Sequence, residues 1–199
     1  MRLVSRIWQT FLIRRQQIFC LTSPGDIVAV QVKATVSITE VSPKNVERVT
    51  DFKSEVLATT FRGFLEEGQY GVYAWLESKV VGHAWAKVCR QSHCRVNGYM
   101  DIHQGDALIH YCNVSEAQRG QNIYPLMLVA LCQCLFSQAR VSRILIDTEV
   151  SNSASLRGIT KVGFEPLGTG TYVQFGSYLL FKHFTSLSNR PAAETRKVK

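Results

Sequence analysis

The stretch from residue 107 to residue 162 alternates twice between strand and helix periodicity, and this constrains the fold more than any other feature. Strand-like residues fill 107–114, apolar residues recur at helical spacing over 121–139, a strand pattern returns at 143–150, and helical spacing returns at 152–162. A two-residue period is typical of strands and a 3.6-residue period of helices. This order favours an α/β fold, in which helices cover the faces of a sheet.

Further strands are expected on both sides of this unit. The other predicted elements are a strand at 16–22, a strand at 28–38, one bent or two short helices within 43–66, a hairpin of 70–76 and 80–88, a polar loop at 89–105, and a closing hairpin of 164–175 and 177–181. A chain of 199 residues fits one ordinary domain. We therefore expect a single domain with a mixed central sheet of about six or seven strands flanked by helices.

The positive charge lies at the two ends of the chain. The formal net charge is +8, of which the first 15 residues carry +4 and the stretch from Arg190 carries +3, so that residues 16–189 carry +1. A nucleic-acid groove should carry its charge on the folded surface, so we expect no nucleic-acid partner. The longest apolar stretch, 124–136, is too short to cross a bilayer, and no transmembrane segment is expected.

Domain boundaries follow from these patterns. We expect residues 1–25 to form a basic arm or helix, 26–185 the folded domain and 186–199 a flexible basic tail. The first residues have no long apolar core of the kind that a secretory signal needs. Packing on the domain is the favoured role for this arm, and surface anchoring or a transit role stays open.

The cysteines indicate a reducing compartment. The chain has six cysteines and no C-x-x-C pair, and in a chain with a sizeable apolar core this argues against a disulfide framework. We therefore expect a cytoplasmic protein. The spacing of Cys89, His93, Cys94 and His103 fits no standard zinc site, so no metal is expected.

The segment from Val114 to Tyr124 carries the clearest chemical signal. A strand ends there, a short polar turn follows and a long helix begins. Amides at the start of a helix are free and carry partial positive charge. Gly120 permits a tight turn and Arg119 adds a full charge, so this loop is predicted to bind a diphosphate. An ordinary strand-to-helix turn is the alternative.

A second segment follows about 30 residues later, where Asn152 to Ser155 opens a helix that ends in Lys161-Val162-Gly163-Phe164. Together the two segments resemble the GCN5-related N-acetyltransferase (GNAT) family. In that family an R-G-x-G-x-G/A loop binds the pyrophosphate of acetyl-CoA, and a later N-x-x-S/A…K-x-G-F stretch flanks the cofactor. The order of elements is similar from about residue 29 to residue 183.

The loop departs from the family pattern at two positions. Asn122 stands in place of the second glycine, and asparagine tolerates left-handed backbone angles. Tyr124 stands in place of the last Gly/Ala. The R-G-x-x-I-Y-P form is similar to a subgroup of bacterial acetyltransferases, some of them associated with cell-surface polysaccharide synthesis, and this hints at an amino sugar as acceptor.

The resemblance implies direct transfer of an acetyl group from acetyl-CoA, as cosubstrate, to a primary amine. It also implies the residues that bind the cosubstrate, which are Cys112, Val114, Arg119, Gly120, Gln121, Asn122, Ile123, Tyr124, Asn152 and Ser155. The acceptor stays open between an amino sugar and another small amine, and a homodimer stays open as well.

The catalytic residues are harder to assign. His110 shares strand parity with Cys112 and Val114, which predicts that its side chain faces the cleft as the general base. A structural histidine that hydrogen-bonds within the core is the alternative, and Asp106 and Glu149 are further candidates for the base. The family's usual acid, a tyrosine, falls at the position of Ile159, and Tyr172 is our substitute. Cys112 as a nucleophile is a less favoured route.

Two other functions remain open. Asn122, Tyr124 and Ile159 are consistent with a non-catalytic acyl-CoA-binding or regulatory module. The other alternative is an acyl- or aminoacyl-transferase that uses a different donor.

Overall fold

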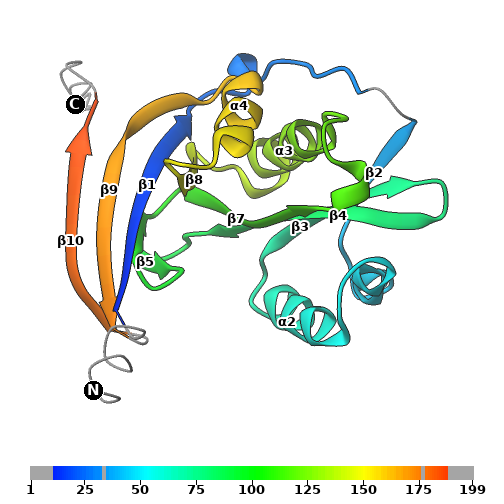
Figure 1. Ribbon diagram of the computed structural model, residues 1–199, viewed down its shortest axis with the longest axis horizontal. Coiled ribbons are helices and arrows are strands. Elements are labelled where there is room, and N and C mark those ends of the chain that lie inside the picture. The colour runs from blue at the N-terminus through cyan, green and yellow to red at the C-terminus, as the bar shows by residue number, and fades with distance from the viewer. Residues whose placement is uncertain (1–10, 33–34, 176–177, 188–199) are drawn as a thin grey trace, which may run out of the picture.

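The computed structural model describes residues 11–32, 35–175 and 178–187. Figure 1 shows one α/β domain built on a mixed eight-stranded sheet in the order β10-β9-β1-β8-β7-β4-β3-β2, beside a two-stranded sheet of β5 and β6. The strands are β1 (Phe11–Leu21), β2 (Val36–Glu40), β3 (Tyr70–Leu76), β4 (Lys79–Val88), β5 (His93–Val96), β6 (Met100–His103), β7 (Asp106–Val114), β8 (Arg143–Glu149), β9 (Glu165–Phe175) and β10 (Tyr178–Ser186). The expected mixed sheet flanked by helices is confirmed.

Three α-helices and several short helical turns join these strands. They are α2 (Glu55–Glu66), α3 (Ile123–Cys134) and α4 (Ser153–Lys161), with 3₁₀ turns η1 (Pro24–Asp26), η2 (Val46–Asp51) and η3 (Glu116–Gln118) and a π-helical turn η4 (Leu135–Ala139). The region 43–66 therefore holds two short helical pieces, one of the two expected forms. Among the described residues, no helix is long and apolar enough to cross a membrane.

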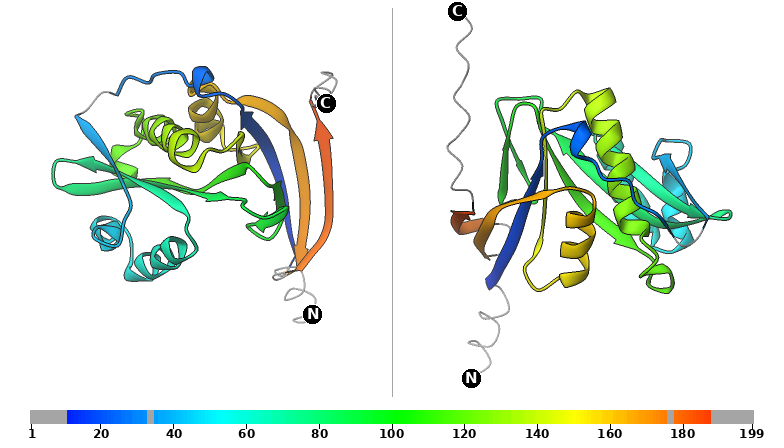
Figure 2. Two further views of the ribbon diagram at one scale, coloured as in Figure 1. Left: turned by 180° about the vertical axis from the view of Figure 1, so that it is seen from behind. Right: turned by 90° about the horizontal axis from the view of Figure 1, so that it is seen from above.

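Helices cover both faces of the sheet (Figures 1 and 2). On one face, α3 and α4 bury Met127, Leu131 and Ile159 against Ile109 and Ile146 of the two central strands. These side chains are at most 2% exposed. Burying a side chain of this size contributes roughly 1.5–3 kcal/mol, so this cluster fixes α3 and α4 over the strands that carry the predicted loop.

The opposite face has two covers, a helix and a hairpin. Phe61 of α2 packs on Tyr73 and Trp85, with ring centroids 6.4 and 4.8 Å away. Beside α2, the β5–β6 hairpin buries Met100 and Ile102. Both reach the central strand β7: Phe64 of α2 lies 5.3 Å from the ring of Tyr111, and β6 contacts β7 directly.

Strand β1 corrects the prediction that residues 1–25 lie outside the domain. It runs antiparallel between β8 and β9, and residues 16–21 of β1 pair with β8 while residues 11–20 pair with β9. Ile18 and Phe19 are both 4% exposed. The apolar residues Leu12 and Ile13 therefore belong to a strand and not to a helical arm. Residues 1–10 and 188–199 lie outside the described residues, so the arm and the tail stay predictions there.

The hairpin corrects the prediction of a loop at 89–105. Strands β5 and β6 pair antiparallel from His93↔His103 to Val96↔Met100. Asn97 and Gly98 form the turn with φ of 53° and 75°, and positive φ at both central positions matches the twist of a two-residue hairpin. The predicted strand at 28–38 is also shorter than expected, because among its described residues pairing begins at Val36, in the strand Val36–Glu40.

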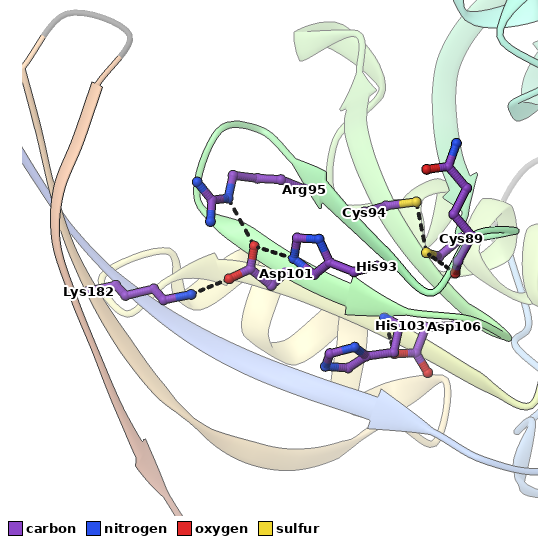
Figure 3. Close-up of polar contacts among 9 residues, drawn as sticks. Cys89, His93, Cys94, Arg95, Asp101, His103, Asp106 and Lys182 are labelled. Atoms are coloured by element: carbon purple, nitrogen blue, oxygen red, sulfur yellow. Dashed lines mark hydrogen bonds and ion pairs between the residues drawn. The ribbon is translucent and has the colours of Figure 1, made fainter.

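Asp101 fastens the hairpin to the edge strand β10 (Figure 3). Its carboxylate accepts hydrogen bonds from Arg95 Nε at 2.9 Å, from His93 Nε2 at 3.1 Å and from Lys182 Nζ of β10. Burial raises the pKa of Asp101, but these three hydrogen bonds outweigh it and hold the pKa well below its usual range. The hairpin thus lies over β1, β9 and β10 and is held there by these polar contacts as well as by the packing of its apolar face.

The cysteines allow a direct chemical test. All six are unpaired, although the sulfur atoms of Cys89 and Cys94 lie 2.7 Å apart near the base of the hairpin (Figure 3). Burial raises the pKa of Cys89 to about 11, so the thiolate needed for disulfide exchange is scarce at neutral pH. We expect thiol titration of the denatured protein, without reductant, to count six thiols. A count of four that Cys94→Ser raises to five would instead reveal a Cys89–Cys94 disulfide.

Candidate active site

The two central parallel strands separate at the site. Strands β7 and β8 pair from Asp106↔Arg143 to Ile109↔Ile146, and no pairing between them follows among the described residues. On its other edge β7 stays paired with β4 up to Val114↔Gly82. The end of β7 therefore keeps one edge of its backbone available to a ligand, and two neighbouring cavities open there.

The larger cavity has a volume of about 1120 Å³ and lies between the end of β7, the following loop and helices α3 and α4. Of the ten residues predicted to bind the cosubstrate, nine line it: Cys112, Val114, Arg119, Gly120, Asn122, Ile123, Tyr124, Asn152 and Ser155. Gln121 is the exception, and its side chain donates a hydrogen bond to Gln118 Oε1 at 2.7 Å. The space is large enough for a nucleotide-sized ligand.

The loop conformation leaves amides free at the start of α3. Gly120 and Asn122 have φ of 79° and 65°, both in the left-handed region that glycine and asparagine tolerate best. Asn122 occupies the N-cap position, but its side chain makes no cap hydrogen bond. It donates instead to the carbonyl of Gln31 at 2.8 Å and accepts from Lys161 Nζ at 3.1 Å. The first amides of α3 therefore remain available for an anion.

The charges around the larger cavity point to an anionic ligand. Three cationic side chains line it, Arg119, Arg157 and Lys161, and the described lining contains no carboxylate. Arg119 makes only a 3.4 Å ion pair with Glu116, and its side chain is 61% exposed. Its guanidinium is therefore free to bind phosphate at little cost.

Tyr124 separates the two cavities and lines both of them. Its hydroxyl lies 3.2 Å from Ser155 Oγ at the start of α4. Gly158 makes room for the ring, because a Cβ atom there would lie 2.6 Å from Tyr124 Cδ1. Burial raises the pKa of Tyr124, so the hydroxyl keeps its proton at neutral pH. Tyr124 therefore fits at this loop position, although it is larger than the Gly/Ala of the family pattern, and it leaves the cavity open.

The smaller cavity has a volume of about 260 Å³ and is mostly polar. It shares Cys112, Tyr124, Asn152 and Ser155 with the larger one, so the two adjoin. Its remaining walls include Arg14 and Gln16 of β1, Asn97 and Tyr99 of the hairpin, His110 of β7, and Asp147 and Glu149 of β8. The sequence analysis missed the walls from β1 and the hairpin. The Asn97-Gly98 pair between strand-like residues was the available signal for the hairpin.

His110 has the geometry of a neutral base. Gln69 Nε2 donates to Glu67 at 2.9 Å, so its Oε1 faces His110 Nε2 at 2.8 Å and accepts a proton from it. The other ring nitrogen, Nδ1, is buried and has no hydrogen-bond partner among the described residues. Burial, with a smaller contribution from Lys87, lowers the pKa of His110 to about 4. The ring is neutral at pH 7, with a free lone pair on Nδ1.

The parity argument for His110 is wrong, although the residue does line a cavity. Tyr111 has φ of 52°, which interrupts the strand alternation between His110 and Cys112. His110 consequently packs toward α2, with its ring 5.2 Å from that of Phe64. Cys112 packs with the core cluster under α3 and α4. His110 thus borders the smaller cavity from the face of the sheet that α2 covers.

The other acid–base candidates have clear structural surroundings. Tyr172 is 5% exposed, packs at a tilt against Tyr99 with ring centroids 4.5 Å apart, and lines neither of the two cavities. Asp106 forms a two-point ion pair with Arg143 at 2.7 and 3.0 Å, so it is held in a structural contact. Glu149 is exposed and borders the smaller cavity. The structure therefore offers no support for Tyr172 as the acid, and Tyr124 is the better placed hydroxyl.

Comparisons with known proteins agree with this geometry. Residues 75–172 match a family model described as an acetyltransferase (GNAT) domain. No curated protein matches the chain. A GCN5-related N-acetyltransferase from Kribbella flavida is similar in structure, with a TM-score of 0.55 and 14% identity over 87% of this chain and 63% of that one. A GNAT-family acetyltransferase from Colwellia psychrerythraea gives a TM-score of 0.60 and 16% identity over 83% and 56%.

A third similar structure contains a ligand. It is described as AAC(6')-Iy in complex with the bisubstrate analogue CoA-S-monomethyl-acetylneamine, and it gives a TM-score of 0.53 and 16% identity over 66% of this chain and 92% of that one. The chain spans less than two thirds of the length of the Kribbella and Colwellia structures. At these identities the likeness is one of fold.

Proposed function

Because this chain belongs to the GCN5-related N-acetyltransferase family and is thereby an acyltransferase, we propose that it transfers an acetyl group from acetyl-CoA directly to a primary amine. The observation that carries the proposal is the pair of adjoining cavities at the separated ends of β7 and β8. The larger one is suited to a phosphate-rich cosubstrate and the smaller one to a polar acceptor. The CoA-based ligand of the similar AAC(6')-Iy structure supports this division.

The larger cavity supplies the contacts that acetyl-CoA needs. The free amides of α3 and the charges of Arg119, Arg157 and Lys161 would bind its phosphates. The unpaired edge of β7 at residues 112–114 would bind the pantetheine arm and polarise the thioester carbonyl. In this assignment, nine of the ten residues predicted to bind the cosubstrate would contact it, and Gln121 would instead stabilise the loop through its hydrogen bond to Gln118.

The smaller cavity supplies the proton transfers. An ammonium cannot attack a thioester, so His110 Nδ1 would accept one proton from the acceptor, directly or through water. The amine nitrogen then forms a bond to the acetyl carbon as the carbon–sulfur bond breaks, and the nitrogen loses its second proton to solvent. Tyr124, which borders both cavities, would donate its proton to the departing thiolate. Tyr124 regains its proton from solvent.

The six unpaired cysteines favour a reducing, cytoplasmic setting for this chemistry.

A two-stage experiment tests the function. Isothermal titration with acetyl-CoA measures the donor, and a thiol-release assay over a panel of amines then measures turnover. Binding with amine-dependent thiol release supports the proposal. Binding without turnover on any amine would favour the non-catalytic acyl-CoA module, and failure to bind acetyl-CoA would contradict the donor assignment.

The loop assignment predicts the effect of one substitution. Arg119→Ala should weaken acetyl-CoA binding by about 1–3 kcal/mol, because it removes a charge-assisted contact to phosphate. The measurement is isothermal titration, and the matched control is Arg62→Ala, which removes an exposed arginine of α2 that pairs with Glu47. Equal affinities for the two variants, with both proteins folded, would rule out a phosphate contact by Arg119.

A further inference from the structure

The smaller cavity limits the size of the acceptor. Its volume of about 260 Å³ lies below the roughly 300–1,000 Å³ of pockets that enclose drug-sized ligands. It is closed on one side by β1 and on another by the hairpin turn at Asn97, both fixed by the sheet and by Asp101. The reacting part of the acceptor is therefore small, with its polar groups only a few bonds apart.

Arg14 is the first of two charged groups that face this space. It lies on β1 with Gln16 and Ile18 on one face of the strand, while Arg15 lies on the other face and is exposed. The Nε atom of Arg14 is buried and finds no hydrogen-bond partner among the described residues. Guanidinium groups bind planar carboxylates with two parallel hydrogen bonds. An unpartnered buried N–H on a side chain that borders a cavity therefore points to an acidic group on the ligand.

Asp147 is the second charged group. Its carboxylate accepts a hydrogen bond of 2.7 Å from the hydroxyl of Tyr99 on the hairpin. Burial raises its pKa, while the hydrogen bond from Tyr99 and the nearby charge of Arg14 act in the opposite direction. The described residues show no ion pair between Arg14 and Asp147, although both border the same cavity. The two charges are thus close enough to interact and are left without direct contact.

A cation and an anion that share a small cavity without pairing are complementary to a zwitterion. Building on the proposed function, we infer that the acceptor is a small amino acid, whose carboxylate binds Arg14 and whose ammonium group lies toward Asp147, Glu149 and His110. An amino sugar offers no carboxylate for Arg14. A phosphorylated amine would bring two negative charges beside Asp147 and Glu149. The products would be an N-acetyl amino acid and CoA, with one proton released from the ammonium group.

Matched acceptors test the carboxylate requirement. The thiol-release assay compares the twenty common amino acids, and for those that react, the corresponding α-amide and decarboxylated amine. We expect loss of the carboxylate to lower kcat/KM at least 100-fold, mainly through KM. Equal rates for an amino acid and its amide, or turnover of other amines without any amino acid reacting, would overturn the inference while leaving the acetyltransferase function in place.

Substitutions at two neighbouring arginines distinguish a loss of carboxylate binding from a loss of folding. Arg14→Gln should abolish the preference for the carboxylate, and Arg14→Lys should restore part of it, because lysine keeps the charge and loses the planar fork. Arg15→Gln, on the exposed face of the same strand, should keep the full preference. Melting temperatures identify any variant that is simply unfolded, and a folded Arg14→Gln with unchanged preference would contradict the inference.

A binding measurement distinguishes this inference from the proposed function. Isothermal titration of the protein with the amino acids, with and without CoA, reports on the smaller cavity independently of turnover. Amino-acid binding that Arg14→Gln removes would support the ligand class even where acetyl-CoA failed to bind. Acetyl-CoA binding without any amino-acid binding or turnover would overturn the ligand class alone.

Discussion

Replacing His110 with alanine is expected to lower the rate of acetyl transfer about 100-fold or more, while the affinity for acetyl-CoA stays near that of the unchanged protein. A positioned general base contributes roughly 10²–10⁴-fold to such a step. His110 borders the smaller cavity, and its Nδ1 is buried there without a hydrogen-bond partner among the described residues. The measurement is kcat from thiol release, together with isothermal titration of acetyl-CoA.

A second buried histidine provides the matched control. His83 is 2% exposed and its Nδ1 contacts the carbonyl oxygen of Tyr111 at 2.7 Å, but it lines neither cavity. His83→Ala should therefore lower the melting temperature as much as His110→Ala and leave turnover almost unchanged. Gln69→Leu should lower turnover in part, because it releases the Nε2 hydrogen bond that orients the ring. A destabilised His110→Ala with normal turnover would leave Asp147, Glu149 or solvent as the base.

The same two histidines should make the protein sensitive to mild acid. Burial lowers the pKa of both His83 and His110 from 6.5 to about 4. Between these values the unfolded chain binds more protons than the folded one, so the free energy of unfolding rises with pH. This contribution is complete above about pH 6.5 and is lost as the pH falls toward 4. Each histidine accounts for about 3 kcal/mol across that window.

Urea unfolding at several pH values between 7.5 and 4 measures this loss. His83→Phe removes one of the two buried titrating groups and keeps a ring to pack near Phe61, so the loss of stability over this range should be about half that of the unchanged protein. His183→Gln changes an exposed histidine of β10 and should leave the pH dependence unaltered. A stability that stays flat from pH 6.5 to pH 4.5 would show that neither ring is held neutral in the folded state.

The larger cavity was predictable because its signals are local. Gly120 and Asn122 are residue types that tolerate left-handed angles, Arg119 precedes a helix start, and Asn152 caps the next helix through a 3.1 Å hydrogen bond from Ser155 N. Each of these features depends on residues only a few positions apart. The conformation of this loop and the cavity beside it therefore follow from the sequence and a family resemblance.

The smaller cavity was not predictable because its walls come from distant parts of the chain. Arg14 and Asp147 border the same cavity only because β1 enters the sheet beside β8, with Gln16 opposite Glu149 and Ile18 opposite Asp147 in the register. No local pattern in residues 11–21 specifies that neighbour. The positive φ of Tyr111 is a second case, since a tyrosine carries no signal for left-handed geometry, and it redirected His110 toward α2. The walls of the smaller cavity were thus not readable from the sequence, whereas those of the larger cavity were.

The position of β1 also has a consequence for how the protein is made. Residues 11–21 leave the ribosome more than a hundred residues before the strands that flank them, β8 and β9. Until those strands are synthesised, the apolar side chains of Ile18 and Phe19 have no partner in the sheet and are open to aggregation or chaperone binding. Contacts of such high sequence separation are slow to form. Insertion of this strand should therefore be a late, post-translational step, and the smaller cavity should be the last part of the molecule to assemble.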